Sequence, residues 1–322
     1  MKLKWTFLTL IFTILTVLTG CEPLLVLDPK GPQAETTSNV IWISIITMSF
    51  VVIVVLVLLV IMLAKYRASK QPDDYEPPHI EGHPVVEGII IGIPILIVIF
   101  LSVVSVVSTY QVETVPEGYE DEEPLVIYAS SSNWKWHFSY PEQDIETVNY
   151  VFFPADRPIE FRLYSYGPIT SFWIPQLAGQ KYAMADMVTT INLAADAPGE
   201  FMGRNANFSG EGFAENTFNA MAMPQSEFDS WVEDIKAKAE PLTEEKFNEL
   251  LEPGHLGQLT FNGTHLEFAP APEGEHSGHN HGSSDDAEHE AHEHDEHSQD
   301  ETDEHEQHDD HGDEEASEHD HH

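Results

Sequence analysis

The chain has 322 residues and a formal net charge of −41, from 55 acidic and 14 basic side chains. This balance excludes nucleic-acid binding, which depends on basic patches. The single cysteine, Cys21, excludes an intrachain disulfide.

The N-terminus has the pattern of a bacterial lipoprotein signal peptide. Lys2 and Lys4 precede an apolar stretch over residues 5–17, and Leu18-Thr19-Gly20-Cys21 fits the lipobox. We expect residues 1–20 to be a signal peptide and Cys21 to be lipidated, with palmitate among its acyl groups. An ordinary signal peptide or a first membrane span is the alternative, but the apolar stretch is shorter than the ~20 residues that a span needs.

Two apolar runs predict membrane-spanning helices at residues 40–64 and 85–108. The connecting segment, residues 65–84, carries Lys65, Arg67 and Lys70 close to the first run. By the positive-inside rule this loop is cytoplasmic. The N-terminal segment 21–39 and everything after the second run are therefore expected outside the cytoplasm, anchored in the cell membrane.

Glu87 lies at the cytoplasmic start of the second predicted span. An ionisable residue at such a boundary is a functional candidate. The alternative is an interfacial carboxylate that only reaches toward water.

Residues 123–223 are typical of an all-β domain. Short runs rich in β-branched and aromatic residues recur with turn residues between them, at the spacing of a β-sandwich; they cover 125–129, 134–140, 148–153, 159–164 and 189–194. Residues 224–252 then predict two helices, with Phe228, Trp231 and Ile235 at helical spacing.

The C-terminal segment 272–322 is predicted to be a disordered tail rich in His, Asp and Glu. Thirteen of the 18 histidines lie between His276 and His322. Such tracts bind divalent metals weakly; the candidates are His276, His279, His281, His292 and His294. A solvated acidic brush is the alternative, and no specific metal site is expected.

The stretch Pro198 to Pro224 resembles the copper-binding loop of subunit II of the cytochrome c oxidases, with the copper ligands missing. In that family the loop carries Cys-x-Glu-x-Cys-x-x-x-His-x-x-Met, and a further His lies upstream. The matching positions here are Ser171, Ser209, Glu211, Phe213, Thr217 and Ala220. A two-copper centre needs thiolates and imidazoles, so these side chains predict that the copper site is lost.

Other segments carry the same resemblance. Trp134 and Trp136 match the family's Trp-x-Trp patch, and we expect them to be interface aromatics against the large subunit. The string around Glu87, VVEGIIIGIP, is similar to a family motif whose Glu lies at the entrance of a proton pathway, although Ile91 stands where the family has Trp. Residues 180–185 and 26–32 look closer to the quinol-oxidising branch of the haem–copper oxidases.

The resemblance, over about residues 18–260, implies subunit II of a bacterial haem–copper quinol oxidase. Its fold would be a two-helix membrane hairpin and an extracytoplasmic cupredoxin-like Greek-key sandwich. The complex would couple oxidation of a quinol, with menaquinol the expected one, to reduction of O₂ to water and to proton translocation. The expected partners are the lipid bilayer, a large subunit that holds the haems and one copper, and smaller membrane subunits.

No catalytic centre and no cofactor are expected in this chain itself, because it has no phosphate loop, haem-attachment motif or nucleophile elbow. Two other functions stay open. One is a metal-buffering membrane lipoprotein that uses the His-rich tail. The other is a cytochrome c oxidase subunit II with a degenerate copper site.

Overall fold

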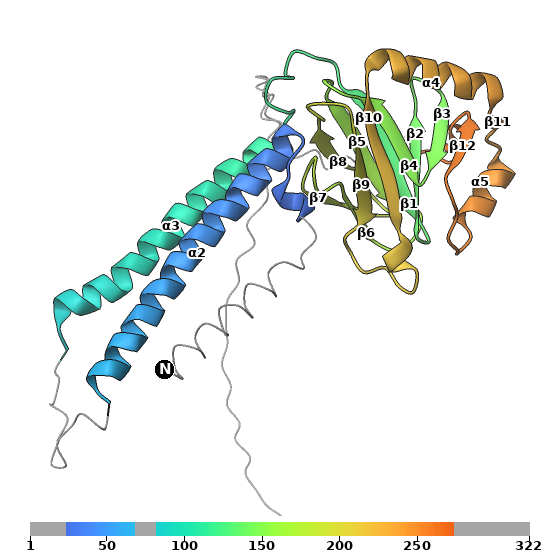
Figure 1. Ribbon diagram of the computed structural model, residues 1–322. Coiled ribbons are helices and arrows are strands. Elements are labelled where there is room, and N and C mark those ends of the chain that lie inside the picture. Colours follow the sequence, from blue (N-terminus) through green and yellow to red (C-terminus); the bar gives the residue numbers. More distant parts are fainter. Residues whose placement is uncertain (1–23, 68–81, 274–322) are drawn as a thin grey trace, which may run out of the picture. The chain divides into compact units, whose positions relative to one another are not determined.

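The computed structural model describes residues 24–67 and 82–273 (Figure 1). The predicted signal peptide, Cys21, most of the loop 65–84 and the histidine candidates from His276 onward lie outside these residues.

Two long helices form an antiparallel hairpin, α2 (Pro32–Lys65) and α3 (Pro84–Glu113) (Figure 1). Each begins with a proline in its first turn, where the missing N–H is not needed. Both are long and apolar enough to cross a membrane, and their apolar side chains are exposed on all sides, as in a helix surrounded by lipid. The two predicted membrane helices are therefore confirmed.

Both helices continue beyond the predicted apolar runs. At about 1.5 Å per residue, the 34 residues of α2 extend well beyond the ~30 Å hydrocarbon core. The extra turns, residues 32–39 and 109–113, are polar. They form part of the extracytoplasmic region, next to the β domain.

The β domain is a sandwich of two sheets. One sheet has seven strands in the order β11-β12-β3-β2-β1-β5-β8, and the other has five in the order β4-β10-β9-β6-β7. Its first eight strands are β1 (Leu125–Ser132), β2 (Lys135–Tyr140), β3 (Ile145–Val148), β4 (Tyr150–Pro154), β5 (Ile159–Ser165), β6 (Thr170–Trp173), β7 (Gln180–Ala183) and β8 (Thr189–Leu193). The others are β9 (Gly199–Asn205), β10 (Thr217–Met223), β11 (Glu240–Pro241) and β12 (Leu259–Asn262). Most neighbouring strands are antiparallel, but three pairs are parallel: β1 with β5, β4 with β10, and β11 with β12. The two packed sheets confirm the predicted sandwich.

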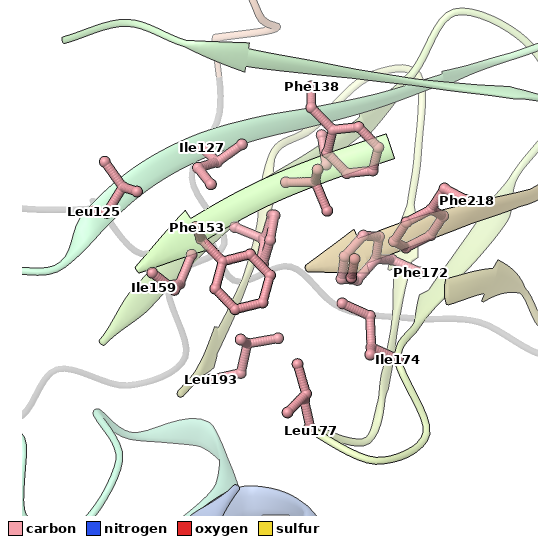
Figure 2. Close-up of a cluster of buried hydrophobic side chains, with 14 of the residues drawn as sticks. Leu125, Ile127, Phe138, Phe153, Ile159, Phe172, Ile174, Leu177, Leu193 and Phe218 are labelled. Carbon is pink, nitrogen blue, oxygen red and sulfur yellow. The ribbon is translucent and has the colours of Figure 1, made fainter. Parts of the chain in front are cut away.

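The space between the sheets is filled by aromatic and aliphatic side chains (Figure 2). Phe172 and Phe218 stack with ring centroids 5.1 Å apart, and Phe138 contacts both rings from the facing sheet. Offset and edge-on aromatic contacts of this kind stabilise a core beyond their area alone. This core holds the strands that carry the matched copper-ligand positions.

A C-terminal cap follows the sandwich and consists of α4 (Gln225–Lys238), α5 (Glu244–Leu251), strands β11 and β12, and the short helix η4 (His265–Glu267). Helix α5 and η4 lie on the outer face of the larger sheet, where Phe247 contacts His137 and His265. Strands β11 and β12 extend that sheet, and α4 packs against β3, β4 and β12. Thr243 caps α5 by accepting the N–H of Lys246. The two helices lie within the predicted range 224–252, but the pairing of β12 with β3 was not predicted. The cap therefore belongs to the same folded unit as the sandwich.

The start of α2 is attached to the sandwich through backbone hydrogen bonds. The N–H of Lys30 donates to the carbonyl of Gln176 at 2.7 Å, and that of Asp196 donates to the Lys30 carbonyl at 3.0 Å. A Cβ atom at Gly31 would lie 2.0 Å from the Ala194 carbonyl oxygen. Only glycine permits this close approach, which fixes the membrane hairpin to the domain.

Candidate functional site

The matched copper-ligand positions lie on β6, on β10 and on the connection from β9 to β10. Ser171 is on β6, and Thr217 and Ala220 are on β10. Ser209 and Glu211 are in the connection, and Phe213 begins the short helix η3 (Phe213–Glu215).

Asn205 links two of these positions through its side-chain amide. Its Oδ1 accepts the backbone N–H of Ser171 at 2.8 Å and that of Asn207 at 2.9 Å. Its Nδ2 donates to Oγ of Ser209 at 3.0 Å. Asn205 is buried, with 3% of its surface exposed. The amide thus joins strand β6 to the loop, and sequence reasoning missed it because an isolated Asn carries no distinctive signal.

Trp134, which lies just before β2, contacts the same loop. It lies in a turn with φ of +72°, and its indole N–H donates to the Ser209 carbonyl at 3.0 Å. A Cβ atom at Gly212 would lie 2.4 Å from the indole ring, so the glycine lets the ring pack flat on the loop. Trp134 is half-buried.

Trp136 does not lie beside Trp134 on an exposed surface. Its side chain is fully buried in the core, against Phe172 and Phe218. The prediction that Trp136 is an interface aromatic is therefore wrong. The reason is local: β2 begins only at Lys135, after the positive-φ turn at Asn133 and Trp134, so the two indoles do not share a strand face.

The remaining matched positions offer little coordinating chemistry. Ala220 is buried opposite Phe201 of β9, and the ring of Phe213 packs 5.6 Å from that of Phe208. Glu211 is exposed. Among residues 24–67 and 82–273, no group of three or more His, Cys, Asp or Glu side chains is placed to hold a metal ion. The arrangement can form hydrogen bonds and exclude water.

Glu87 lies in the first turn of α3 and is exposed. Its backbone N–H donates to the carbonyl of His83 at 3.0 Å, and its carboxylate folds back over Gly82. A negative charge at a helix N-terminus is favourable. The carboxylate is therefore held at the start of α3, exposed to solvent.

A second polar site, which the sequence did not indicate, lies beneath the C-terminal cap. Glu146 of β3 is fully buried. Its Oε2 accepts hydrogen bonds from the Ser139 hydroxyl at 2.9 Å, from His265 Nδ1 at 2.7 Å and from the His265 backbone N–H at 2.9 Å. The other ring nitrogen of His265, Nε2, bonds the Tyr164 hydroxyl at 2.5 Å. These contacts tie three strands to the cap.

His137 of β2 completes this buried cluster. Its Nε2 bonds the Ser132 hydroxyl at 2.7 Å, and its Nδ1 lies 3.9 Å from Glu146 Oε1. Burial lowers the pKa of His137 to about 3, and the charge of Glu146 offsets only part of this effect. Burial alone would raise the pKa of Glu146, but the charge and hydrogen bonds of His265 outweigh it and hold that pKa below its ordinary value.

Comparison with known proteins identifies the family. No protein-family model matches the chain. Quinol oxidase subunit 2 of Bacillus subtilis (strain 168) is 49% identical over 260 residues, which are 80% of this chain and 81% of that protein. The Bacillus anthracis protein of the same name is 42% identical over 269 residues, 83% of this chain and 92% of the relative. A probable quinol oxidase subunit 2 of Staphylococcus haemolyticus is 44% identical over 275 residues, 85% of this chain and 72% of the relative.

Among solved structures, two similarities are weak. The periplasmic domain of subunit II of cytochrome oxidase from Bradyrhizobium japonicum aligns with a TM-score of 0.34 and 22% identity, over 35% of this chain and 94% of that domain. A chain of a haem–copper terminal oxidase dimer aligns with a TM-score of 0.32 and 12% identity, over 44% of this chain and all of that one. The assignment rests on the sequence relatives: over most of its length, this chain belongs to the family of quinol oxidase subunit 2, a component of an oxidoreductase complex.

Proposed function

We propose that this chain serves a quinol oxidase from which the copper electron-entry site has been lost. The complex would take electrons from a membrane quinol, menaquinol in particular, reduce O₂ to water and translocate protons. The observation that supports this best is the hydrogen bonding of Ser171, Asn205 and Ser209. An amide and two hydroxyls occupy the place where soft copper ligands would be needed.

The loss of the copper site would determine which subunit receives the electrons. Without copper the domain cannot relay electrons from a water-soluble protein donor. A quinol dissolved in the bilayer can instead reach the large subunit directly, and that subunit would hold the haems and one copper. The helices α2 and α3 would pack on the large subunit, and smaller membrane subunits would complete the assembly. Trp134 would contribute to the extracytoplasmic contact.

The electron donor tests this proposal. We expect the purified complex to consume O₂ with a short-chain quinol as donor and to be inactive with reduced cytochrome c, because the relay between a soluble donor and the haems is missing. Oxygen-electrode rates, normalised to haem, measure both. Comparable rates with reduced cytochrome c would instead support a cytochrome c oxidase subunit.

We propose that Glu87 is a proton-entry residue for the complex. Its exposed carboxylate at the start of α3 can exchange protons with water, and in the complex it would stand at the mouth of a low-dielectric path. Replacing it with Gln keeps the size and removes the titratable group. Turnover of the Glu87→Gln complex should therefore fall by about tenfold or more, with haem content unchanged.

Glu227 provides a matched control. It is also an exposed carboxylate in the first turn of a helix, α4, but lies in the β domain. Glu227→Gln should leave turnover unchanged. Wild-type rates in Glu87→Gln between pH 6 and 9 would assign Glu87 to the lipid interface alone.

Lipidation of Cys21 and weak metal binding by the tail histidines are part of the same proposal. The lipobox and the extracytoplasmic position of the β domain support the first. The two membrane helices already anchor the protein, so the acyl chains would add to an existing anchor. The tail would add charge and weak metal binding without a part in turnover.

A further inference from the structure

A buried tyrosine lies at one end of the polar cluster beneath the C-terminal cap. Tyr164 of β5 has only 1% of its surface exposed. Its hydroxyl oxygen lies 2.5 Å from Nε2 of His265, and Nδ1 of the same ring lies 2.7 Å from Oε2 of Glu146. A phenol, an imidazole and a carboxylate therefore form one hydrogen-bonded chain in the interior. This chain offers the phenolic proton an acceptor.

The carboxylate fixes the direction of these hydrogen bonds. Oε2 of Glu146 also receives the hydroxyl of Ser139 and the backbone N–H of His265, and an ionised carboxylate can only accept. Nδ1 of His265 therefore carries a proton. When the ring carries this one proton, Nε2 has a free lone pair and accepts the hydrogen bond from the Tyr164 hydroxyl.

The imidazole is held in place by its neighbours. The ring of Phe247 stacks on that of His265, with centroids 4.4 Å apart and an angle of 9° between the ring planes. The backbone N–H of His265 donates to Glu146 at 2.9 Å. Proton transfer requires donor and acceptor within hydrogen-bond reach of each other. The acceptor is therefore already positioned for the Tyr164 proton.

Burial makes loss of the proton alone unfavourable. It raises the pKa of Tyr164 well above the ordinary value, and the neighbouring Tyr166 and the charge of Glu146 act in the same direction. If an electron leaves together with the proton, the phenol becomes a neutral radical and no charge is left buried on it. The proton then gives His265 a positive charge beside the carboxylate of Glu146, which is a paired charge.

A second tyrosine connects this site to the surface. The ring centroid of Tyr128 lies 6.3 Å from that of Tyr164. Tyr128 is half-buried and lines a surface pocket of about 310 Å³ together with Arg162, which donates to the Tyr128 hydroxyl at 2.9 Å. A positive charge at such a position attracts small anions. The two adjacent rings therefore provide a path for an electron from the interior to an anionic oxidant at the surface.

We infer that Tyr164 is a redox-active tyrosine. A one-electron oxidant of the class of the carbonate radical anion takes an electron from Tyr164 by way of Tyr128, while the phenolic proton passes to Nε2 of His265. The products are the carbonate dianion, a neutral tyrosyl radical and an imidazolium paired with Glu146, so one electron and one proton have each moved once. This activity goes beyond the proposed function, because it needs neither a quinol nor the large subunit.

Flash oxidation of the purified full-length chain in detergent tests the location. Illumination of tris(bipyridine)ruthenium(II) with a cobalt(III) acceptor produces ruthenium(III), which stands in for the radical oxidant. Rapid freezing and electron paramagnetic resonance then record the organic radicals. We expect a neutral tyrosyl signal that persists after the signals of exposed side chains have decayed, because Tyr164 is screened from solvent and from other radicals.

Tyr140 supplies a matched control. It is also fully buried, but its hydroxyl donates to the backbone carbonyl of Phe152 at 2.9 Å, and an amide carbonyl does not take up the proton. Tyr164→Phe should abolish the persistent signal, and Tyr140→Phe should leave it at the wild-type level. A persistent tyrosyl signal that survives Tyr164→Phe, or that is lost equally in Tyr140→Phe, overturns the inference.

The proton acceptor is tested separately. His265→Phe keeps an aromatic ring against Phe247 and removes Nε2, so the persistent signal should be lost although Tyr164 is intact. A folded His265→Phe chain with the wild-type signal contradicts proton transfer to this ring. If that variant does not fold, the wild-type chain exchanged into D₂O decides. Its persistent radical should form more slowly than in H₂O, and equal rates overturn the inference.

Discussion

Replacing Glu146 with leucine should lower the free energy of unfolding by about 3–5 kcal/mol. The carboxylate is fully buried and accepts three hydrogen bonds at Oε2, two from His265 and one from Ser139. Without it, the backbone N–H of His265 would be left buried and unpaired, and Nδ1 would keep only its contact with the Ser139 hydroxyl at 3.1 Å. Denaturant titration of the purified protein in detergent, followed by tryptophan fluorescence, measures the loss.

A double-mutant cycle shows whether the loss comes from this pairing. His265→Leu alone should cost a similar amount, and the double variant should cost clearly less than the sum of the two. Glu160→Gln is the control, because that carboxylate is partly exposed and pairs with Arg162, where an ion pair contributes at most about 1 kcal/mol. Additive losses in the cycle would contradict the role of the cluster as a joint between sheet and cap.

Stability should also fall as the pH drops below about 6.5, because His137 stays neutral in the folded state. Its pKa is about 3 when folded, against an ordinary value of 6.5. Between these values the unfolded chain binds a proton that the folded chain does not. The free energy of unfolding therefore falls by at most about 1.4 kcal/mol for each pH unit of acidification. Glu146, with its lowered pKa, adds to the loss below about pH 4.5. Melting temperatures measured from pH 7.5 to 4 give the profile.

His137→Phe isolates this contribution. It removes the titrating ring and keeps an aromatic side chain close to Phe247, whose ring centroid lies 5.6 Å from that of His137. The charged or titratable groups around His137 are Glu146, His265 and Lys135. The variant should lose less stability than the wild type between pH 6.5 and 4.5. Parallel profiles would assign the acid sensitivity to other groups.

The membrane hairpin was the easiest part to predict, since an uninterrupted apolar run allows few other structures. The ends of its helices were harder. Residues 32–39 are polar, yet they continue α2 because Pro32 starts the helix and Ala34 donates its N–H to the carbonyl of Leu177 at 3.2 Å. Such a tertiary contact leaves no pattern in the local sequence.

Strand β2 shows why burial of the outer face of the larger sheet was not predicted. Its alternation of Lys135, His137 and Ser139 with Trp136 and Phe138 predicts one polar, solvent-facing side. In the structure the cap buries that side as well, and Lys135 donates to the carbonyls of Glu252 and Gly254. The partners lie more than 100 residues away along the chain. Periodicity alone cannot find them.

The candidate site also contains residues that the sequence indicates and residues that it does not. The loop from Ser209 to Ala220 could be recognised by its alignment with a family motif, in which only Glu211 keeps the residue type. The amide that organises the loop, Asn205, was not readable, because its role depends on the approach of β6. Trp136 was placed wrongly because the turn at Asn133 interrupts the strand alternation.

Copper binding by the assembled complex tests the loss of the electron-entry site most directly. The measurement uses a complex in which residues 274–322 are deleted, so that the tail histidines cannot bind metal, and records copper content and near-infrared absorption after incubation with copper. The full-length complex, treated alike, shows how much copper the tail contributes. We predict only the copper of the large subunit and no near-infrared band, because Ser171, Asn205 and Ser209 offer hydroxyl and amide groups. Two additional copper ions per complex, bound tightly and with a purple colour, would contradict the account.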